Sequence, residues 1–471
     1  MSEPEGLEGY IEWAESNLGV VVHHPLHLGS TPGKDERGVF CVDAVPPESI
    51  LVSVPWEALL TVEGVVSTPM EPLLENGSRE DDILCLLLLY HKHVLGEASP
   101  FWRHLVVLPE KYHQTVHYSE DELELLRGSS LHAMTIQWKS QVQADYKEVL
   151  ALELKDGCTV GSAFSGFFTK EAYLWALSTV WSRFVTVERA GHQRKAMAPV
   201  FDMFNHSPKG QTVHGFQEAN DCLHLVTLQA WEAGQEILIS YGPMSNARLL
   251  LLHGFCLQDN PFDCVELWAT MSSDAPGYAV KSKVLEERGV HFSDRPFKLT
   301  VQGFGDTLLP TLRVQRAEGV EIDSRTLEKA FLGEVLSRQN EQEVLEVLKN
   351  TLLSMLQERE ASCPPPYLDR GHSVPVGREG LGGAGVATET DKSFASDTPE
   401  QSGEQVRVNG SMIEGKKCLD EFCEEAGGRP PPEDRRCAAA ILVDGERKIL
   451  RACLQKTVGL LSAIEQGETL D

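Results

Sequence analysis

The sequence contains no long apolar run. Its 471 residues include no stretch of 18 consecutive apolar residues, so we expect neither a membrane-spanning helix nor a membrane partner. Residues 1–9 are acidic and hold no apolar segment of the kind that a secretory signal peptide needs, and they lack the arginine-rich bias of an organelle transit peptide. The protein is therefore expected in the cytoplasm, the nucleus or both.

Basic residues are also scarce. Lys and Arg together number 42 against 70 Asp and Glu, which gives a formal net charge of −28 at pH 7. Binding to a phosphate backbone needs clustered basic side chains, so this balance argues against nucleic acid as the main partner. A strongly acidic chain suits a basic protein substrate, and it equally suits plain solubility, so the charge alone leaves both interpretations open.

Metal-binding cysteine patterns are missing as well. The 11 cysteines include no pair with CxxC spacing, and Cys418 and Cys423 have no matching second pair. A structural zinc site usually draws its ligands from closely spaced pairs, so no metal is expected. An odd number of scattered cysteines is typical of free thiols in a reducing compartment.

Apolar periodicity predicts a mixture of helices and short strands. Helices are indicated by apolar residues at spacings of three and four, and by Ser119 followed three positions later by Glu122, which is a capping box. Strands are indicated by short apolar runs between turn-forming residues. The expected helices are 7–17, 81–95, 119–154, 169–183, 246–252, 278–288, 324–338, 341–359 and 436–464, and the expected strands are 20–22, 39–45, 50–54, 199–205, 223–230 and 236–241.

One segment differs in composition from the rest. Residues 362–435 are poor in apolar residues and rich in Pro, Gly, Ser and charge, which predicts a disordered insertion. Gly380, Gly382 and Gly385 within it match the GxGxxG nucleotide-binding pattern. That pattern requires a strand before it and a helix after it, and neither is expected here, so we interpret the match as compositional.

The residues that could carry chemistry lie between positions 198 and 255. Asp202, Asn205 and His206 fall at the end of an expected strand, where an Asn-His pair can orient a ligand through side chains and main chain. The same pair could instead only satisfy buried backbone groups at a knot-like chain crossing. Taken alone, these residues favour neither interpretation.

A wider pattern resembles a known family. The segment from Asp202 to His206 (DMFNH) is followed by ISYG ending at Gly242 and then by Gly254-Phe255, while RGVF at 37–40 and WSR at 181–183 come before it. In this order and spacing the chain resembles the SET methyltransferases, in particular the subfamily of the Rubisco large-subunit methyltransferase and the actin histidine methyltransferase. The resemblance covers nearly all of the chain outside 362–435, and it implies S-adenosylmethionine as cofactor and a protein as substrate.

The resemblance implies a role for each matching position. Tyr241 would place its hydroxyl at the point of methyl transfer, as an aligning group and not as a general base. Phe184 and Val185, which follow Arg183, would border the substrate together with Tyr241. The residues that would hold the cofactor are Asp35, Glu36, Arg37, Arg183, Asp202, Asn205, His206, Tyr241, His253 and Phe255.

Methyl transfer from a sulfonium would need positioning more than a strong base. The attacking nitrogen must be neutral, and a lysine with a pKa of ~10.4 loses proton affinity in a dry channel beside a positive charge. Holding the reacting groups in line can lower the barrier by as much as ~7–11 kcal/mol.

The departures from the family pattern bear on the substrate. In the actin histidine methyltransferase an Asn closely following the arginine helps to hold the target imidazole, whereas Phe184 and Val185 carry no hydrogen-bonding side chain. An apolar wall suits a desolvated amine, so we expect a lysine substrate. His253 stands where the Rubisco enzyme's pattern has Tyr, which leaves the number of transferred methyl groups open. A protein-histidine methyltransferase and a non-catalytic SET-fold binding module remain as alternatives.

The expected fold is α+β. We expect a SET domain of short sheets with a knot-like crossing, carrying a helical insertion and followed by an all-α substrate-binding domain, and we expect a monomer. The expected parts are 1–70 and 196–264 for the SET domain, 71–195 for its helical insertion, 265–361 and 436–466 for the substrate-binding domain, and 362–435 for the disordered insertion.

Overall fold

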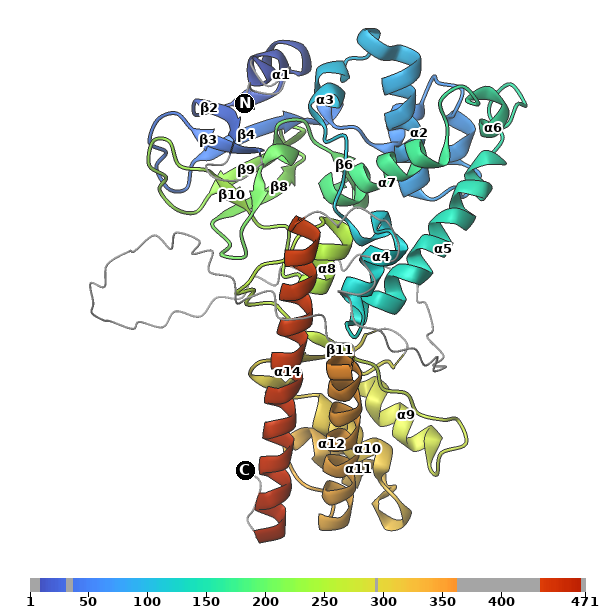
Figure 1. Ribbon diagram of the computed structural model, residues 1–471, viewed down its shortest axis with the longest axis vertical. Coiled ribbons are helices and arrows are strands. Elements are labelled where there is room, and N and C mark those ends of the chain that lie inside the picture. Colours follow the sequence, from blue (N-terminus) through green and yellow to red (C-terminus); the bar gives the residue numbers. More distant parts are fainter. Residues whose placement is uncertain (1–8, 31–36, 293–294, 362–432, 467–471) are drawn as a thin grey trace. The chain divides into compact units, whose positions relative to one another are not determined.

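The computed structural model describes residues 9–30, 37–292, 295–361 and 433–466 (Figure 1). The chain divides into two compact units, one of residues 1–264 with 431–446 and one of residues 265–430 with 447–471. Asp35, Glu36 and residues 362–432 of the expected insertion lie outside the described residues.

Short sheets make up the strand part of the first unit. The largest has four antiparallel strands in the order β1-β4-β9-β8, two hairpins pair β2 with β3 and β5 with β6, and β7 pairs in parallel with β10. In β4, Leu51, Val52 and Val54 are each fully buried, so both faces of this strand are covered. The strands are β1 (Val21–Val22), β2 (Leu26–Ser30), β3 (Arg37–Cys41), β4 (Ile50–Pro55), β5 (Phe184–Arg189), β6 (His192–Met197), β7 (Asn205–His206), β8 (Thr212–Gln217), β9 (Cys222–Thr227) and β10 (Leu238–Ile239).

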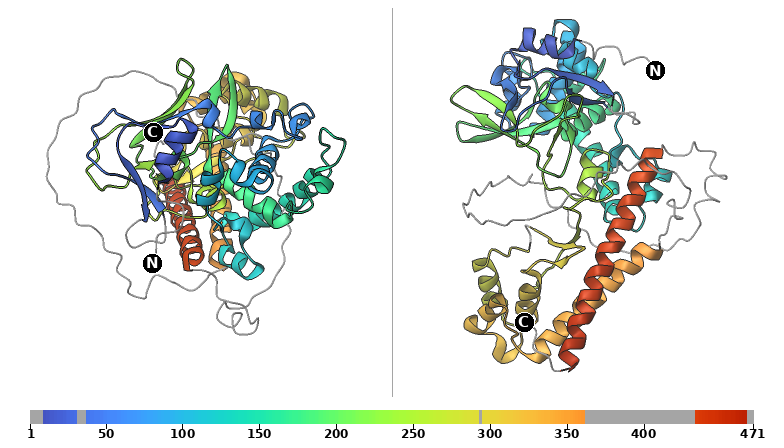
Figure 2. Two further views of the ribbon diagram at one scale, coloured as in Figure 1. Left: turned by 90° about the horizontal axis from the view of Figure 1, so that it is seen from above. Right: turned by 90° about the vertical axis from the view of Figure 1, so that its left-hand side faces the viewer.

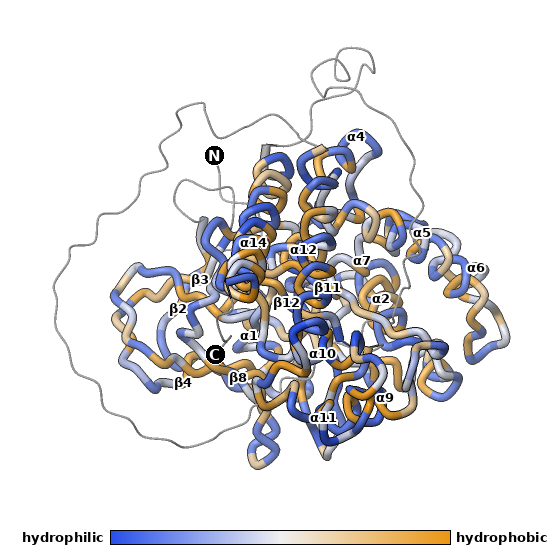
Figure 3. Tube along the Cα trace, turned by 90° about the horizontal axis from the view of Figure 1, so that it is seen from below, coloured by the Kyte–Doolittle hydropathy of each residue, from blue (hydrophilic) through white to orange (hydrophobic). Residues whose placement is uncertain are grey.

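Helix α2 lies at the centre of the helical part of this unit. Residues 83–89 of α2 are all buried, and α7 packs along it, so a helix that is apolar on every side is enclosed by its neighbours (Figure 3). The helices are α1 (Tyr10–Leu18), α2 (Glu80–Tyr90), α3 (Trp102–Val107), α4 (Glu120–Leu123), α5 (Ser130–Leu150), α6 (Val160–Ala163), α7 (Lys170–Arg183) and α8 (Asn246–Leu252), and a π-helical turn (His91–Leu95) follows α2.

The predicted capping box is confirmed. The Ser119 hydroxyl accepts a hydrogen bond from the Glu122 backbone N–H at 3.2 Å, and the Glu122 carboxylate accepts one from the Ser119 N–H at 2.8 Å. The single helix predicted over 119–154 is wrong, because the chain breaks between α4 and α5. Gly128 stands in this break with a φ of 77°, which a helix cannot accommodate.

The strand predicted over 199–205 is also wrong. Val200 takes a φ of 70° and a ψ of −50°, which turns the chain out of any extended path. A short 3₁₀ helix, Phe201–Met203, follows, and the strand β7 is confined to Asn205–His206. The hairpin β5–β6 was not predicted, although Ala190 and Gly191, both at positive φ, form its tight turn.

The second unit is mainly helical, with a small antiparallel sheet that the expectation of an all-α domain did not include. Its largest core cluster joins α10, α12, the sheet and the C-terminal part of α14, whose packing against α12 is visible in Figure 2. Its elements are β11 (Val265–Leu267), α9 (Tyr278–Glu287), β12 (Phe297–Thr300), β13 (Gly303–Phe304), α10 (Leu308–Arg316), α11 (Ser324–Lys329), α12 (Arg338–Ala361) and α14 (Glu433–Gln466). The helix predicted over 324–338 is interrupted after α11, and Gly333 stands in the interruption with a φ of 84°.

Helix α14 contributes to both units, which corrects the expected domain division. Residues 436–446 were expected in the substrate-binding domain, but they belong to the first unit. The reason is apolar packing, because Ala438, Ala439 and Leu442 are buried in a cluster with Leu250 and Leu251 of α8. Across the ranges described, no helix combines the length and apolar character needed to cross a membrane.

Candidate functional site

The two-stranded parallel ladder of β7 and β10 carries the centre of the candidate site. Asn205 pairs with Leu238 and His206 with Ile239, and the Ser207 N–H continues the ladder to the Ile239 carbonyl at 2.8 Å. Two segments 33 positions apart in the sequence thereby run side by side. The Tyr241 backbone N–H donates to Nδ1 of His206 at 3.0 Å, which brings Tyr241 directly beside the Asn-His pair.

The Tyr241 hydroxyl is fixed by a backbone carbonyl. It donates a hydrogen bond of 2.8 Å to the Phe204 carbonyl, one residue before β7. Since this bond uses the hydroxyl proton, the oxygen has only lone pairs left to offer to another group. A phenol in this state can align N–H or polarised C–H groups.

Four aromatic rings gather at this point. The Tyr241 ring stacks between His206, at a centroid distance of 4.9 Å, and His253, at 4.7 Å. Phe255 lies 6.2 Å from the His206 ring and 6.1 Å from the His253 ring. Gly254 stands between His253 and Phe255 with a φ of 84°, and any Cβ there would come within 2.7 Å of the His113 backbone. Only glycine therefore lets the chain place the His253 ring against Tyr241 and the Phe255 ring against His206.

His253 is uncharged in this cluster. Burial, with smaller contributions from His206 and Arg183, lowers its pKa from the ordinary 6.5 to about 3, although a hydrogen bond with the Ser182 backbone acts in the opposite direction. Burial also lowers the pKa of His206. Both rings therefore stay neutral near pH 7 and add no positive charge beside Tyr241.

We expect His253 to make the protein less stable in mild acid. The unfolded chain protonates this histidine near pH 6.5 and the folded chain only near pH 3, so the free energy of unfolding falls as the pH drops through that window. The loss is up to about 1.4 kcal/mol per pH unit, or roughly 2 kcal/mol between pH 6.5 and pH 5. In urea unfolding at these two pH values, His253→Phe should lose roughly 2 kcal/mol less than the wild type. Equal losses in the two proteins would contradict the buried, neutral ring.

Arg183, the last residue of α7, places a guanidinium next to the 3₁₀ turn before β7. Its Nη1 donates to the Asp202 carbonyl at 2.7 Å, and its Nε has no hydrogen-bond partner. Burial by itself lowers the pKa of Arg183, but the charge of Asp202 and the neighbouring Tyr112 and Tyr241 raise it above the ordinary value overall. Arg183 is thus a cation with an unused N–H donor.

Asp202 lies beneath this turn and not on its surface. Its side chain is fully enclosed, neither carboxylate oxygen has a hydrogen-bond partner, and one of them lies 3.3 Å from Nε2 of His104. The resemblance placed Asp202 among the cofactor-binding residues. An enclosed carboxylate can act on a ligand only through its neighbours, so we assign it a supporting place under Arg183.

Asn205 ties β7 to the opening strand β3. Its amide nitrogen donates to the Arg37 carbonyl and to the Glu236 carboxylate, both at 2.7 Å. Arg37 in turn donates through Nη1 to the Val107 carbonyl at 2.5 Å. The amide donors of Asn205 are therefore used within the protein, and its side-chain carbonyl is the atom that remains for a ligand.

The two residues expected to border the substrate lie in packing positions. Val185 is 6% exposed and belongs to the main core of the first unit, and the Phe184 ring lies under Nζ of Lys195 at 5.0 Å. Asp35 and Glu36 are outside the described residues. Sequence reasoning missed Tyr112, Glu236, Tyr10 and His104. No local signal marks Tyr10, His104 and Tyr112, because each reaches the site from a distant part of the chain. Glu236 lies only five positions before Tyr241, at the start of the strand predicted over 236–241.

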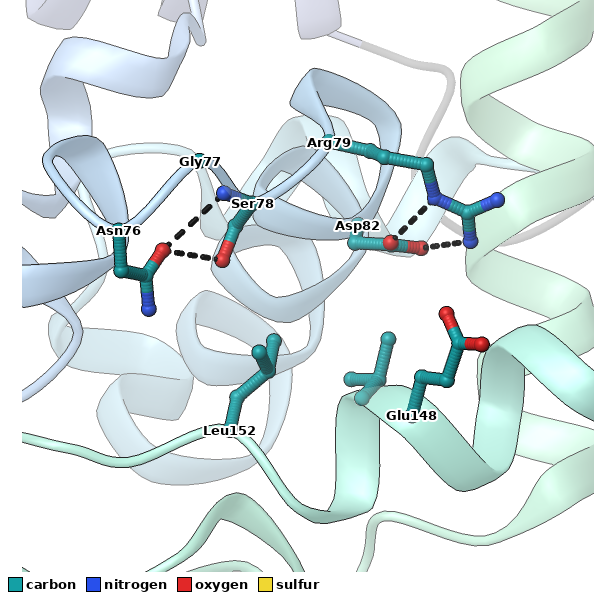
Figure 4. A pocket seen from close by; sticks show the side chains of 8 residues that line it. Asn76, Gly77, Ser78, Arg79, Asp82, Glu148 and Leu152 are labelled. Carbon is teal, nitrogen blue, oxygen red and sulfur yellow. Dashed lines mark hydrogen bonds and ion pairs between the residues drawn. The ribbon is translucent and has the colours of Figure 1, made fainter. Parts of the chain in front are cut away.

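A separate pocket of about 180 Å³ opens near the start of α2, and Figure 4 shows it from close by. Asn76 bonds to Ser78, and Arg79 bonds to Asp82, so polar groups that line it satisfy one another. Its lining shares no residue with the cluster around Tyr241.

Family models match two stretches of the chain. Residues 36–242 match the SET domain, and residues 272–362 match the Rubisco LSMT substrate-binding domain. The chain contains a SET domain. The SET match contains Arg37, Arg183, Asn205 and Tyr241 but ends before His253 and Phe255. The His253 ring nevertheless contacts Tyr241, and the Phe255 ring contacts His206.

Relatives of this SET-domain protein include methyltransferases. It is 28% identical over 283 residues to human actin-histidine N-methyltransferase, covering 55% of this chain and 46% of the relative. It is 28% identical over 346 residues to mouse SET domain-containing protein 4, covering 70% of this chain and 77% of the relative. The chain thus matches a little under half of the actin-histidine enzyme's length.

Solved structures share the fold of this SET-domain protein. The SET domain of LSMT bound to methyllysine and AdoHcy matches with a TM-score of 0.70 at 18% identity, covering 99% of this chain and 94% of that chain. Rubisco LSMT bound to AdoMet matches with a TM-score of 0.68 at 18% identity over the same shares. At 18% identity, this similarity establishes the fold alone.

Proposed function

We propose that this SET-domain protein is an S-adenosylmethionine-dependent protein N-methyltransferase. The observation that carries the proposal is the Tyr241 hydroxyl, held by the Phe204 carbonyl at the β7–β10 ladder and flanked by the neutral rings of His206 and His253. A relative that is 28% identical over 55% of this chain is named an actin-histidine N-methyltransferase, which supports the same class of reaction.

The residues around the ladder have the chemistry that S-adenosylmethionine requires. Arg183 has an unused N–H donor for the carboxylate of the methionine part. The side-chain carbonyl of Asn205, whose amide nitrogen is already bonded, suits its ammonium group. The rings of His206, His253 and Phe255 offer apolar faces for the adenine. When bound, the cofactor supplies a methyl group activated by the adjacent sulfonium.

The residues of the chain would orient the acceptor and keep it neutral. Tyr241 would accept a hydrogen bond from the substrate nitrogen and so orient its lone pair. Neutral His206 and His253 leave the positive charge of the cofactor uncompensated on that side, which lowers the proton affinity of the amine. No side chain needs to act as a strong base, because the nitrogen can lose its proton to water before it reaches the site.

We infer that the acceptor is lysine. Phe184 and Val185, which follow Arg183, carry no hydrogen-bonding side chain, and Val185 lies in the core, so neither supplies a partner for the second nitrogen of an imidazole. A basic segment of the partner protein would suit the net charge of −28. A lysine amine needs the single acceptor that the Tyr241 oxygen provides.

Labelling with radioactive S-adenosylmethionine in a cell lysate tests the proposal, followed by mass spectrometry of the labelled residue. We expect a protein band that carries the label on lysine. A label on histidine would contradict lysine as the acceptor but would still support methyltransferase activity. If the wild type labels no protein and calorimetry detects no cofactor binding, a non-catalytic SET-fold binding module is the better description.

A further inference from the structure

Val200 takes a backbone conformation that valine avoids. Its φ of 70° and ψ of −50° fall near the rare γ-turn with positive φ, which is strained for any residue with a Cβ and most for a β-branched one. Val200 directly precedes the 3₁₀ turn that leads to Asn205 and His206. Strain of this kind persists only where surrounding contacts hold it, and it gathers at functional sites.

The Tyr10 hydroxyl of α1 holds this turn. It accepts a hydrogen bond from the Val200 N–H at 3.1 Å and lies 2.8 Å from Nδ1 of His104. Tyr10 is fully buried, and burial together with Asp202 raises its pKa well above the ordinary 10.0. The phenol is therefore neutral, and its one hydroxyl bonds both the Val200 N–H and Nδ1 of His104.

His104 extends the same chain of contacts to Asp202. Its other ring nitrogen, Nε2, lies 3.3 Å from a carboxylate oxygen of Asp202. Asp202 stands two residues after Val200. The Tyr10 hydroxyl thus contacts Val200 directly and Asp202 through His104. The Asp202 carbonyl is in turn the acceptor for Arg183.

We propose that Tyr10 and His104 are positioning residues for the cofactor-binding turn 200–206, with the Tyr10 hydroxyl balancing the strain at Val200. The proposal rests on the proposed function only in taking S-adenosylmethionine as the ligand of this turn. The competing explanation is that α1 merely fills the core, where Tyr10, Ile11 and Ala14 are buried together.

The test combines Tyr10→Phe with substitutions at Val200. Glycine adopts a positive φ without strain, whereas alanine keeps the Cβ and loses only the methyl groups, so Val200→Ala is the matched control. Ile11→Val removes one methyl group from the same helix without touching the hydroxyl network, and it controls for lost packing. The readouts are hydrogen–deuterium exchange of peptides spanning 198–207, the Kd for S-adenosylmethionine by calorimetry, and thermal unfolding.

We expect Tyr10→Phe to weaken cofactor binding about tenfold and to speed exchange of the 198–207 peptides to a similar degree, since the strained turn at Val200 loses the hydrogen bond that holds it. In the Val200→Gly background the same change should alter the Kd less than about twofold, whereas in the Val200→Ala background the tenfold loss should remain. Ile11→Val should lower the melting temperature and leave the Kd unchanged.

Two results would overturn the proposal. One is an unchanged Kd and unchanged exchange in Tyr10→Phe, which would mean that α1 contributes only core packing. The other is an equal loss in the glycine and alanine backgrounds, which would mean that the hydroxyl does not balance strain at Val200. If the wild-type protein binds no S-adenosylmethionine, the proposed function fails, and the exchange of 198–207 in the single and double variants still decides the positioning role.

Discussion

Replacing Tyr241 with phenylalanine should lower the rate of methyl transfer by a factor on the order of 10² and leave the Kd for S-adenosylmethionine within about threefold. The substitution keeps the ring, so the stacking with His206 and His253 persists, and it removes only the oxygen that the Phe204 carbonyl orients. A nucleophile displaced by about 1 Å loses a factor of this size. Single-turnover rates and calorimetry separate the two quantities.

Tyr146→Phe is the matched control. The Tyr146 hydroxyl also donates to the carbonyl of a phenylalanine, Phe168, at 3.2 Å, and it belongs to the packing between α5 and α7 away from the ladder. Its loss should leave the rate unchanged. If Tyr241→Phe weakens cofactor binding and catalysis to the same extent, Tyr241 serves the cofactor and the aligning role is wrong.

Local features of the fold were predictable because local interactions form them. The capping box of Ser119 and Glu122 needs only four residues, and α7 and α8 follow from apolar spacing and their N-cap residues. The Val200 turn was not predictable, since Pro199, Val200 and Phe201 resemble the start of a strand. Its conformation depends on Tyr10, 190 positions earlier.

The candidate site was predictable only through resemblance. The contact between His206 and Tyr241 joins positions 35 apart, and no periodicity brings them together. Both His206 and Tyr241 were identified from the pattern DMFNH followed later by ISYG. The places of Phe184 and Val185 could not be derived in the same way, because strand alternation and the packing of β5 decide where each side chain points. The supporting residues Tyr10, His104 and Tyr112 were missed because each is far away in the sequence.

Arg435, in the first turns of α14, should prove essential to the stability of the first unit. It donates to the Glu122 carboxylate at 2.7 Å and to the Tyr112 carbonyl at 3.0 Å, and it lies 5.0 Å from the Tyr118 ring. The pair is largely buried, with exposed side-chain fractions of 13% and 10%. Three turns further along α14, Glu446 accepts hydrogen bonds from the backbone N–H and the hydroxyl of Ser130, the first residue of α5.

Arg435→Met should therefore lower the free energy of unfolding by about 3–5 kcal/mol, because it leaves a buried carboxylate without its partner. Urea unfolding followed by tryptophan fluorescence reports mainly the first unit, since Trp268 is the one tryptophan of eight that lies in the second. The control is Lys155→Met in the same unit. Lys155 pairs with Glu71 at 3.0 Å, but exposed fractions of 66% and 40% limit that pair to about 1 kcal/mol or less.

The double variant Arg435→Met with Glu122→Gln separates lost charge balance from lost packing. Glutamine can keep the capping box with Ser119 while removing the negative charge that Arg435 neutralises. If the unpaired charge causes the loss, the double variant should recover most of the stability that Arg435→Met removes. No recovery would mean that the bond to the Tyr112 carbonyl matters more. Because the Tyr112 hydroxyl bonds to Thr179 of α7, the helix that ends at Arg183, cofactor affinity should then fall together with stability.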